Sequence, residues 1–189
     1  MRNKSGGCLW VVLALLVFIG GQGVSAENRL QQAWDALKNG SQVDVYFSPY
    51  DDCEKPYIDT IIKASSYVYV SCFGLTNPNI TKALCDVSKK GIKVIVCTDR
   101  MMAGGKMALV REQELWSAGA EYIVKKKQVL EHNKMLFVMT KEGDQYAIIG
   151  SWNLSGNSQS QDNSMVVIKD KNITNKVRDA ILRIYHRDK

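Results

Sequence analysis

The sequence predicts a single α/β domain with a mixed, largely parallel sheet flanked by helices on both faces. Three observations support this fold class. Apolar strand-like runs alternate with amphipathic helical stretches between residues 43 and 124. Hydrophobic residues make up 46% of the 189 residues, which is enough for a buried core. No internal repeat or low-complexity linker divides the chain, so residues 27–189 are expected to form one domain.

The first 26 residues have the pattern of a signal peptide. Arg2 and Lys4 precede an apolar run of 11 residues at 9–19, and Val24-Ser25-Ala26 supplies small residues for cleavage. A run of this length is short for a bilayer span. We therefore expect a periplasmic or secreted protein with no stable membrane partner after cleavage. An uncleaved N-terminal membrane anchor is the alternative.

The elements can be assigned in order from periodicity and from helix-stop signals such as Asn39-Gly40 and Gly91. Alternating helices and apolar strands are typical of βαβ units, and the later runs around Glu142-Gly143-Asp144 are typical of a hairpin. The predicted helices are 30–37, 57–64, 78–90, 106–118 and 172–187, and the predicted strands are 43–47, 67–73, 92–98, 121–124, 135–139, a second apolar run between Asp144 and Gly150, and 165–169.

Acidic residues gather in the loop at 49–56, which carries Asp51, Asp52 and Glu54. Three neighbouring carboxylates suggest a metal site, but Pro56 favours the start of a helix there. Carboxylates stabilise a helix N-terminus. Because no histidine or further acidic cluster lies nearby in sequence, we favour the helix start and expect no metal.

The net charge and the cysteines set weaker bounds. Loss of residues 1–26 removes two basic side chains and no acid, so the net charge falls from +6 to +4. This suits a polyanionic substrate and is equally ordinary for a soluble basic protein.

Four cysteines remain after loss of residues 1–26, and they permit two disulfides in any of three pairings or free buried thiols. No Cys-x-x-Cys pair is present, so zinc is not expected. These cysteines are Cys53, Cys72, Cys85 and Cys97.

The predicted hairpin carries the residues most suited to catalysis. His132 and Lys134 are two positions apart, as are Ser151 and Asn153, so each pair shares one face of a strand. If the strand ends pair, an imidazole, an ammonium, a hydroxyl and an amide converge. Such a set can bind and attack a phosphate. The competing interpretation is a solvated polar strand end. Asp162 offers a carboxylate that could hold the imidazole.

These residues resemble the signature of the single-motif nucleases of the phospholipase D superfamily, a group that includes small plasmid-encoded bacterial nucleases. The signature is His-x-Lys-x4-Asp followed by Gly-Ser-x-Asn, and His132, Lys134, Gly150, Ser151 and Asn153 match it. Asp162-Asn163 stands where the family has Glu-Asn. Met139 occupies the usual Asp position. The resemblance runs from residue 45 to the C-terminus and implies the phospholipase D/nuclease fold.

The resemblance also implies a homodimer with one composite site and no cofactor. One histidine cannot stand on both sides of a phosphorus atom, so a catalytic chain with one motif needs a second copy across a two-fold axis. His132 would form a phosphohistidine, and the partner copy would protonate the leaving oxygen. Lys134, Asn153 and Ser151 would stabilise charge, and Asp162 would orient the imidazole.

Further basic residues are candidates for substrate binding. Lys125, Lys126 and Lys127 precede His132 and are expected to contact a nucleic-acid backbone, although a lysine run also protects an edge strand from aggregation. Arg100 follows a strand end, where α/β folds place ligand-binding loops. The second histidine, His186, lies among basic residues of the last helix and is expected to be solvated.

The leading functional hypothesis is a metal-independent phosphodiesterase that acts as a nonspecific endonuclease on DNA or RNA. The same chemistry on a lipid, as in phospholipase D, is one alternative. A nucleic-acid-binding protein with weakened catalysis is another, with Met139 as its visible sign.

Overall fold

The computed structural model describes residue 40, residues 42–126 and residues 129–189. The predicted signal peptide, the predicted helix at 30–37 and Lys127 lie outside the described residues. Within the described part, no helix is long and apolar enough to cross a membrane.

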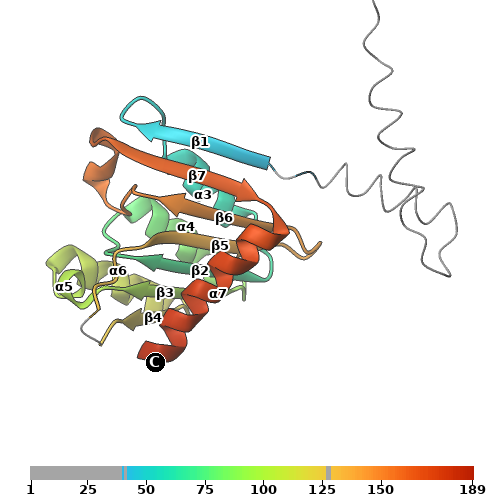
Figure 1. The fold of residues 1–189 in the computed structure, drawn as a ribbon. Helices are drawn as coiled ribbons and strands as arrows, with labels where there is room; N and C mark the ends of the chain where they lie inside the picture. Colours follow the sequence, from blue (N-terminus) through green and yellow to red (C-terminus); the bar gives the residue numbers. More distant parts are fainter. Residues whose placement is uncertain (1–39, 41, 127–128) are drawn as a thin grey trace, which may run out of the picture. The chain divides into compact units, whose positions relative to one another are not determined.

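Seven strands form one sheet in the order β1-β7-β6-β5-β2-β3-β4 (Figure 1). The strands are β1 Gln42–Ser48, β2 Tyr67–Cys72, β3 Lys93–Thr98, β4 Glu121–Val124, β5 Lys134–Met139, β6 Gln145–Gly150 and β7 Asn163–Lys169. The pairs β2–β3 and β3–β4 are parallel, and the other four pairs are antiparallel. The mixed sheet is therefore confirmed, with a smaller parallel part than expected, because the hairpin inserts between β2 and the β7–β1 pair.

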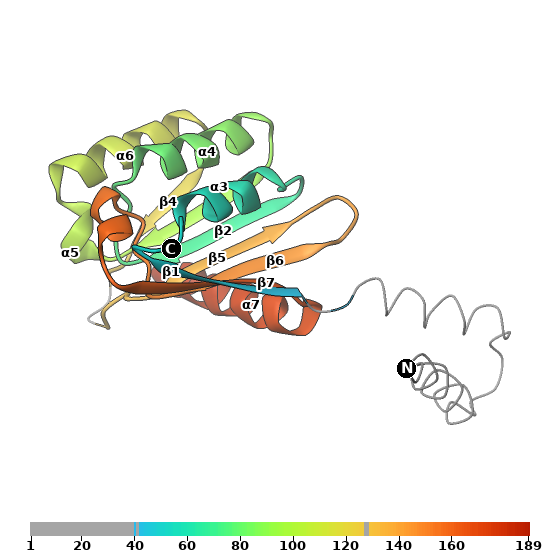
Figure 2. The ribbon, with the colours of Figure 1, turned by 90° about the horizontal axis from the view of Figure 1, so that it is seen from above.

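Helices cover both faces, as the sequence predicted. Figure 2 shows α3, α4 and α6 above the sheet and α7 below it. The helical segments are α3 Glu54–Ile62, α4 Pro78–Lys89, α5 Arg100–Ala103, α6 Lys106–Ser117, the 3-10 turn η1 Gly156–Ser160 and α7 Lys171–Asp188.

Helix starts follow from capping side chains. Asn77 accepts hydrogen bonds from the backbone N–H groups of Asn79 and Ile80, with Pro78 at the first helical position, so α4 begins where predicted. The start of α3 was predicted three residues late. Asp52 accepts from the N–H groups of Glu54 and Lys55 at 3.0 and 3.1 Å, which starts the helix before Pro56.

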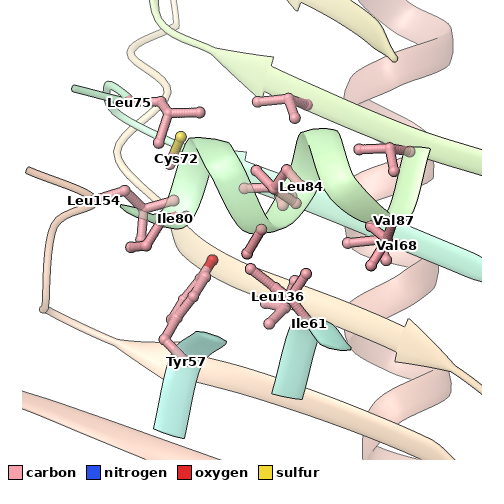
Figure 3. Close-up of a cluster of buried hydrophobic side chains, with 14 of the residues drawn as sticks. Tyr57, Ile61, Val68, Cys72, Leu75, Ile80, Leu84, Val87, Leu136 and Leu154 are labelled. Carbon is pink, nitrogen blue, oxygen red and sulfur yellow. The ribbon is translucent and has the colours of Figure 1, made fainter. Parts of the chain in front are cut away.

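Two apolar cores lie on the two faces of the sheet. The larger core packs α3, α4 and α6 against the sheet, and Figure 3 shows Tyr57 and Ile61 of α3 gathered with Leu84 of α4 and Leu136 of β5. The smaller core packs α7 on the opposite face and includes Phe137. Alternate residues of β5 thus enter different cores, and burial of each large side chain contributes about 1.5–3 kcal/mol.

The described cysteines are free thiols. Cys53, Cys72, Cys85 and Cys97 are all buried, so the free-thiol alternative holds in this structure. Burial raises the pKa of Cys72 far above its ordinary value and that of Cys97 to about 12. The two sit one step apart on the paired strands β2 and β3 and face different cores, which keeps their sulfur atoms separated.

Candidate active site at one edge of the sheet

Polar strand ends meet at a single edge of the sheet, on the left in Figure 1. In the register, Cys72 at the end of β2 pairs with both Thr98 and Lys134. Thr98 in turn pairs with Val124, the last residue of β4. Lys134 begins β5, so the loops that follow β2, β3 and β4 and the residues just before β5 lie together. This edge holds the predicted catalytic residues.

His132 and Lys134 lie against Phe73, which follows β2. The rings of His132 and Phe73 have centroids 5.2 Å apart, and the Lys134 Nζ lies 5.7 Å from the Phe73 centroid. Lys134 is only 7% exposed and donates a hydrogen bond to the His132 carbonyl at 2.7 Å. Burial lowers the pKa of Lys134 below its ordinary value. His132 is exposed, so the site presents an accessible imidazole beside a desolvated ammonium.

Gly150, Ser151 and Asn153 follow the end of β6. A Cβ on Gly150 would meet the Ser164 carbonyl oxygen at 2.2 Å, so only glycine permits this approach of β7. The Ser151 Oγ accepts from the Ser164 N–H at 3.0 Å, which leaves the hydroxyl proton of Ser151 free to be donated. Trp152 anchors this segment in the larger core, 2% exposed.

The segment after β2 joins the two halves of the site. Leu75 forms a parallel bridge with Leu154, and the N–H groups of Thr76 and Asn77 both donate to the Leu154 carbonyl at 3.0 Å. Asn153 therefore lies beside Gly74, next in sequence to the Phe73 that contacts His132. Residues 73–75 thus contact His132 and Lys134 on one side and bridge to the segment after Asn153 on the other.

The route to this convergence differs from the prediction. The β5–β6 register pairs Met135 with Ile149, so one step further Lys134 lies opposite Gly150. Ser151 comes one residue after Gly150. Because side chains alternate between the faces of a strand, Ser151 would lie on the opposite face from Lys134. The hairpin alone does not direct both pairs to one spot. After Gly150 the chain leaves the strand, and Leu154 bridges to Leu75 beyond the end of β2.

Asp162 is exposed and directly precedes β7, at the same edge of the sheet. It lines an open depression of about 640 Å³ together with Ser151, Phe47 and Tyr50. No hydrogen bond between Asp162 and His132 is formed in the described part of the chain. Within a single subunit, no hydrogen bond therefore supports the prediction that Asp162 orients the His132 imidazole.

A buried polar network beneath His132 was missed from the sequence. Glu131 is 1% exposed and accepts hydrogen bonds from Ser71 Oγ at 2.9 Å and from Asn133 Nδ2 at 2.6 Å. Its own N–H donates to Asp99 Oδ2 at 2.7 Å. Glu131 thereby fixes the segment on both sides of His132. The available signal was an acidic residue directly before the histidine.

The lysine run divides into different environments. Lys125 is 3% exposed, and its Nζ lies 3.5 Å from Glu131 Oε2, so its predicted contact with substrate is corrected to a buried ion pair. Lys126 is exposed, and Arg100 is exposed as the first residue of α5. These two remain available to a ligand at the edge.

Met139 lies at the other end of β5 from Lys134 and packs against the core beneath α7. It pairs with Gln145, and its carbonyl accepts from the N–H groups of Ser65 and Ser66. The unusual residue thus affects the base of the hairpin and has no contact with His132.

The acids of the loop after β1 serve the fold. Besides Asp52 at α3, Asp51 accepts from the Phe47 N–H at 2.8 Å. Among the residues that the structure describes, no group of three or more histidine, cysteine or acidic side chains is arranged to hold a metal ion.

Comparison with known proteins agrees with this geometry. A family model described as "Cardiolipin synthase, PLD-like domain" matches residues 57–185. A protein named phospholipase D from Rickettsia bellii is 28% identical over 131 residues, which cover 69% of this chain and 62% of that protein. The chain thus spans less than two thirds of the length of this relative.

Two solved structures share the fold. Nuc from Salmonella typhimurium, titled a phospholipase D family member, superposes with a TM-score of 0.72 at 18% identity, covering 79% of this chain and 97% of Nuc. NucT from Helicobacter pylori gives a TM-score of 0.67 at 17% identity over 78% of this chain and 97% of NucT. The family model covers the His-x-Lys and Gly-Ser-x-Asn residues that meet at the sheet edge, and the chain therefore belongs to the phospholipase D-like domain family.

Proposed function

We propose that the protein is a metal-independent phosphodiesterase that cleaves DNA or RNA with little sequence preference. One observation carries the proposal: the exposed His132 imidazole adjoins the buried Lys134 ammonium at the sheet edge. An accessible nucleophile beside a desolvated positive charge suits attack on a phosphodiester. The fold shared with Nuc, together with the His-x-Lys and Gly-Ser-x-Asn residues of this chain, supports nuclease activity.

In the proposed reaction, an imidazole nitrogen of His132 attacks phosphorus while the P–O bond to the leaving group breaks. The partner subunit's His132, protonated at the start, gives its proton to the departing oxygen. The same group then takes a proton from water as the water oxygen displaces the histidine nitrogen. The two steps return both imidazoles to their starting protonation states and release a phosphomonoester.

The remaining residues stabilise charge on the phosphoryl oxygens. Lys134 supplies a fixed cation, Asn153 an amide donor, and Ser151 its free hydroxyl proton. Removal of one such donor lowers kcat by about 100–1,000-fold in comparable sites. In a dimer, Asp162 would be free to orient the imidazole of the partner subunit, because it forms no bond to His132 within its own chain.

The test uses supercoiled plasmid and a structured RNA in excess chelator. We expect nicking by the wild-type chain, loss of cleavage in His132→Ala, and unchanged cleavage in His186→Ala. His186 is the matched control because the chain has two histidines and both are exposed. Equal activity of His132→Ala and the wild type, or complete loss in chelator, would contradict the proposal.

Lipid phosphodiester hydrolysis is the second candidate, favoured by the name phospholipase D of the Rickettsia relatives. Release of phosphatidic acid from phospholipid vesicles, without cleavage of plasmid or RNA, would establish it in place of nuclease activity. Retarded but intact nucleic acid would point to a binding protein with weakened catalysis. Met139, remote from His132, gives that third outcome no support within the site.

We also propose export with cleavage after residue 26, on the basis of the N-terminal sequence pattern. Mass spectrometry of the protein from a periplasmic extract should give a mature chain that begins at Glu27. Recovery of the uncleaved chain in the membrane fraction would favour the N-terminal anchor instead.

A further inference from the structure

Four aliphatic side chains stand exposed beside the candidate site. Met101 is 71% exposed, Val129 66%, Met107 50% and Leu130 48%. We call these four residues the apolar rim. They come from α5, the first turn of α6 and the loop that leads into His132. Clustered exposure of this kind marks an interaction surface more often than isolated apolar residues do.

A buried carboxylate brings the two segments of the rim together. Asp99 Oδ1 accepts from the Met101 N–H at 2.9 Å, and its Oδ2 accepts from the Glu131 N–H at 2.7 Å. The Asp99 N–H donates to the Phe73 carbonyl, and the Phe73 ring contacts His132. Asp99 therefore ties the backbone at Met101 and at Glu131, next to Leu130, to the Phe73 backbone, and the Phe73 ring contacts the His132 ring.

The charges around the rim have one sign. Arg100, Lys106 and Lys126 are exposed between or beside its residues. Residues 100–110 contain no acid, and the nearby carboxylates Asp99 and Glu131 are 2% and 1% exposed. The surface thus combines exposed aliphatic side chains with cations and shows no exposed carboxylate among residues 100–110, 126 and 129–131.

We propose that the apolar rim docks the candidate site onto the surface of an anionic lipid bilayer. Aliphatic side chains can enter the acyl boundary while flanking cations bind anionic head groups. Single-stranded nucleic acid would instead favour aromatic side chains for base stacking, and the rim has none. The proposal rests on phosphodiester chemistry at His132 and deepens it by giving that site a lipid surface.

This docking differs from the expectation that no stable membrane partner remains after export. It requires only reversible contact through one edge of the sheet. The rim is invisible in the sequence because Met101, Met107, Val129 and Leu130 lie among ordinary helix and loop residues. The hydrogen bonds of Asp99 tie the α5 segment to the segment that leads into His132.

A local fluorescent probe tests the docking in the full chain. The Cys8→Ser variant provides the background, since the four described cysteines are buried and poorly available to label. Met101→Cys, labelled with nitrobenzoxadiazole, should shift to the blue and brighten several-fold with phosphatidylglycerol vesicles but not with phosphatidylcholine vesicles. Ile62→Cys is the control, because Ile62 is 58% exposed at the end of α3, at the opposite edge of the sheet. Its label should not change, even if the N-terminal residues bind the vesicles.

A paired set of variants measures the contribution of the rim. Met101→Ser with Leu130→Ser should weaken partitioning to phosphatidylglycerol vesicles about tenfold, as expected for two lost apolar contacts. Ile62→Ser with Ile173→Ser removes comparable exposed apolar groups at the opposite edge and should leave partitioning unchanged. Thermal unfolding confirms that both double variants are folded.

The outcomes separate this inference from the proposed chemistry. Cleavage of the soluble diester bis(p-nitrophenyl) phosphate requires His132 and does not require the rim. Cleavage with no change at the Met101 probe would overturn the docking and leave the phosphodiesterase intact. A probe response without His132-dependent cleavage would support docking and contradict the chemistry. A label that responds only to a single-stranded oligonucleotide would assign the rim to nucleic acid and also overturn the proposal.

Discussion

At the residue scale, the burial of Lys134 serves the candidate site and lowers the stability of the fold. Its side chain is only 7% exposed, and its ammonium donates a hydrogen bond to the His132 carbonyl. Desolvation of a charge opposes folding, whereas the same desolvation strengthens its field at a bound phosphate. His-x-Lys could be identified from sequence, but the contact of the lysine with Phe73, which follows β2, could not.

The lowered pKa of Lys134 predicts a pH-dependent stability. The unfolded lysine keeps its proton up to about its ordinary pKa of 10.5, whereas the folded one loses it earlier. Between those two values the unfolded state binds more protons, so the free energy of unfolding rises with pH. Lys134→Met should therefore be as stable as the wild type or about 1 kcal/mol more stable at pH 7. The difference in stability between Lys134→Met and the wild type should narrow at pH values above the lowered pKa of Lys134. The variant should also lose activity. Urea unfolding from pH 7 to 11 checks it, and a constant or widening difference would contradict it.

Glu131 and Lys125 give a second prediction at this scale. Each is nearly fully buried, so removal of one partner leaves an uncompensated charge. Glu131→Gln or Lys125→Met should each lower the free energy of unfolding by about 3 kcal/mol, and the double variant should recover part of the loss. Asp59→Ala, which removes the exposed pair with Lys55, serves as the control and should have no measurable effect. Additive losses in the double variant would show that the pair is not coupled.

At the scale of elements, the end of β6 depends on one glycine. The backbone of β7 passes so close that a Cβ at Gly150 would also meet the Cα of Met165 at 2.9 Å. Gly150→Ala should therefore cost about 1–3 kcal/mol and separate Ser151 from Ser164. Gly156→Ala is the control, because a Cβ there meets nothing within 4 Å. Unfolding in urea measures both variants, and equal stability would mean that β7 can move without loss.

Helices and strands were predicted correctly where the hydrophobic periodicity and the capping residues lie within the element itself. The strand at 121–124 and the start of the helix at 78 came directly from the sequence. The short helix α5 was missed because its four residues follow from the single cap of Asp99. The site was identified by residue type, but its assembly was not, because the bridge between Leu75 and Leu154 joins segments 79 positions apart.

At the scale of the whole molecule, a composite site predicts a distinctive mixing behaviour. If each active dimer needs His132 from both subunits, co-expression of equal amounts of wild-type and His132→Ala chains leaves about one quarter of the dimers active. Independent monomers would retain about half. Activity per total chain, with subunit ratios measured by mass spectrometry, distinguishes the two. Sedimentation of a fully active monomer would remove the composite site altogether.

The pairing of β1 with β7 has a consequence for the folding of the newly made chain. β1, near the start of the described residues, finds its strand partner only in β7, close to the end. The residues between β6 and β7 are bonded to the end of β1, where Ser48 Oγ donates to the Gln161 carbonyl at 2.7 Å. β1 therefore cannot pair until β7 has been synthesised. A product truncated before β7 would leave β1 without this strand partner and the Ser151 Oγ without the Ser164 N–H that donates to it.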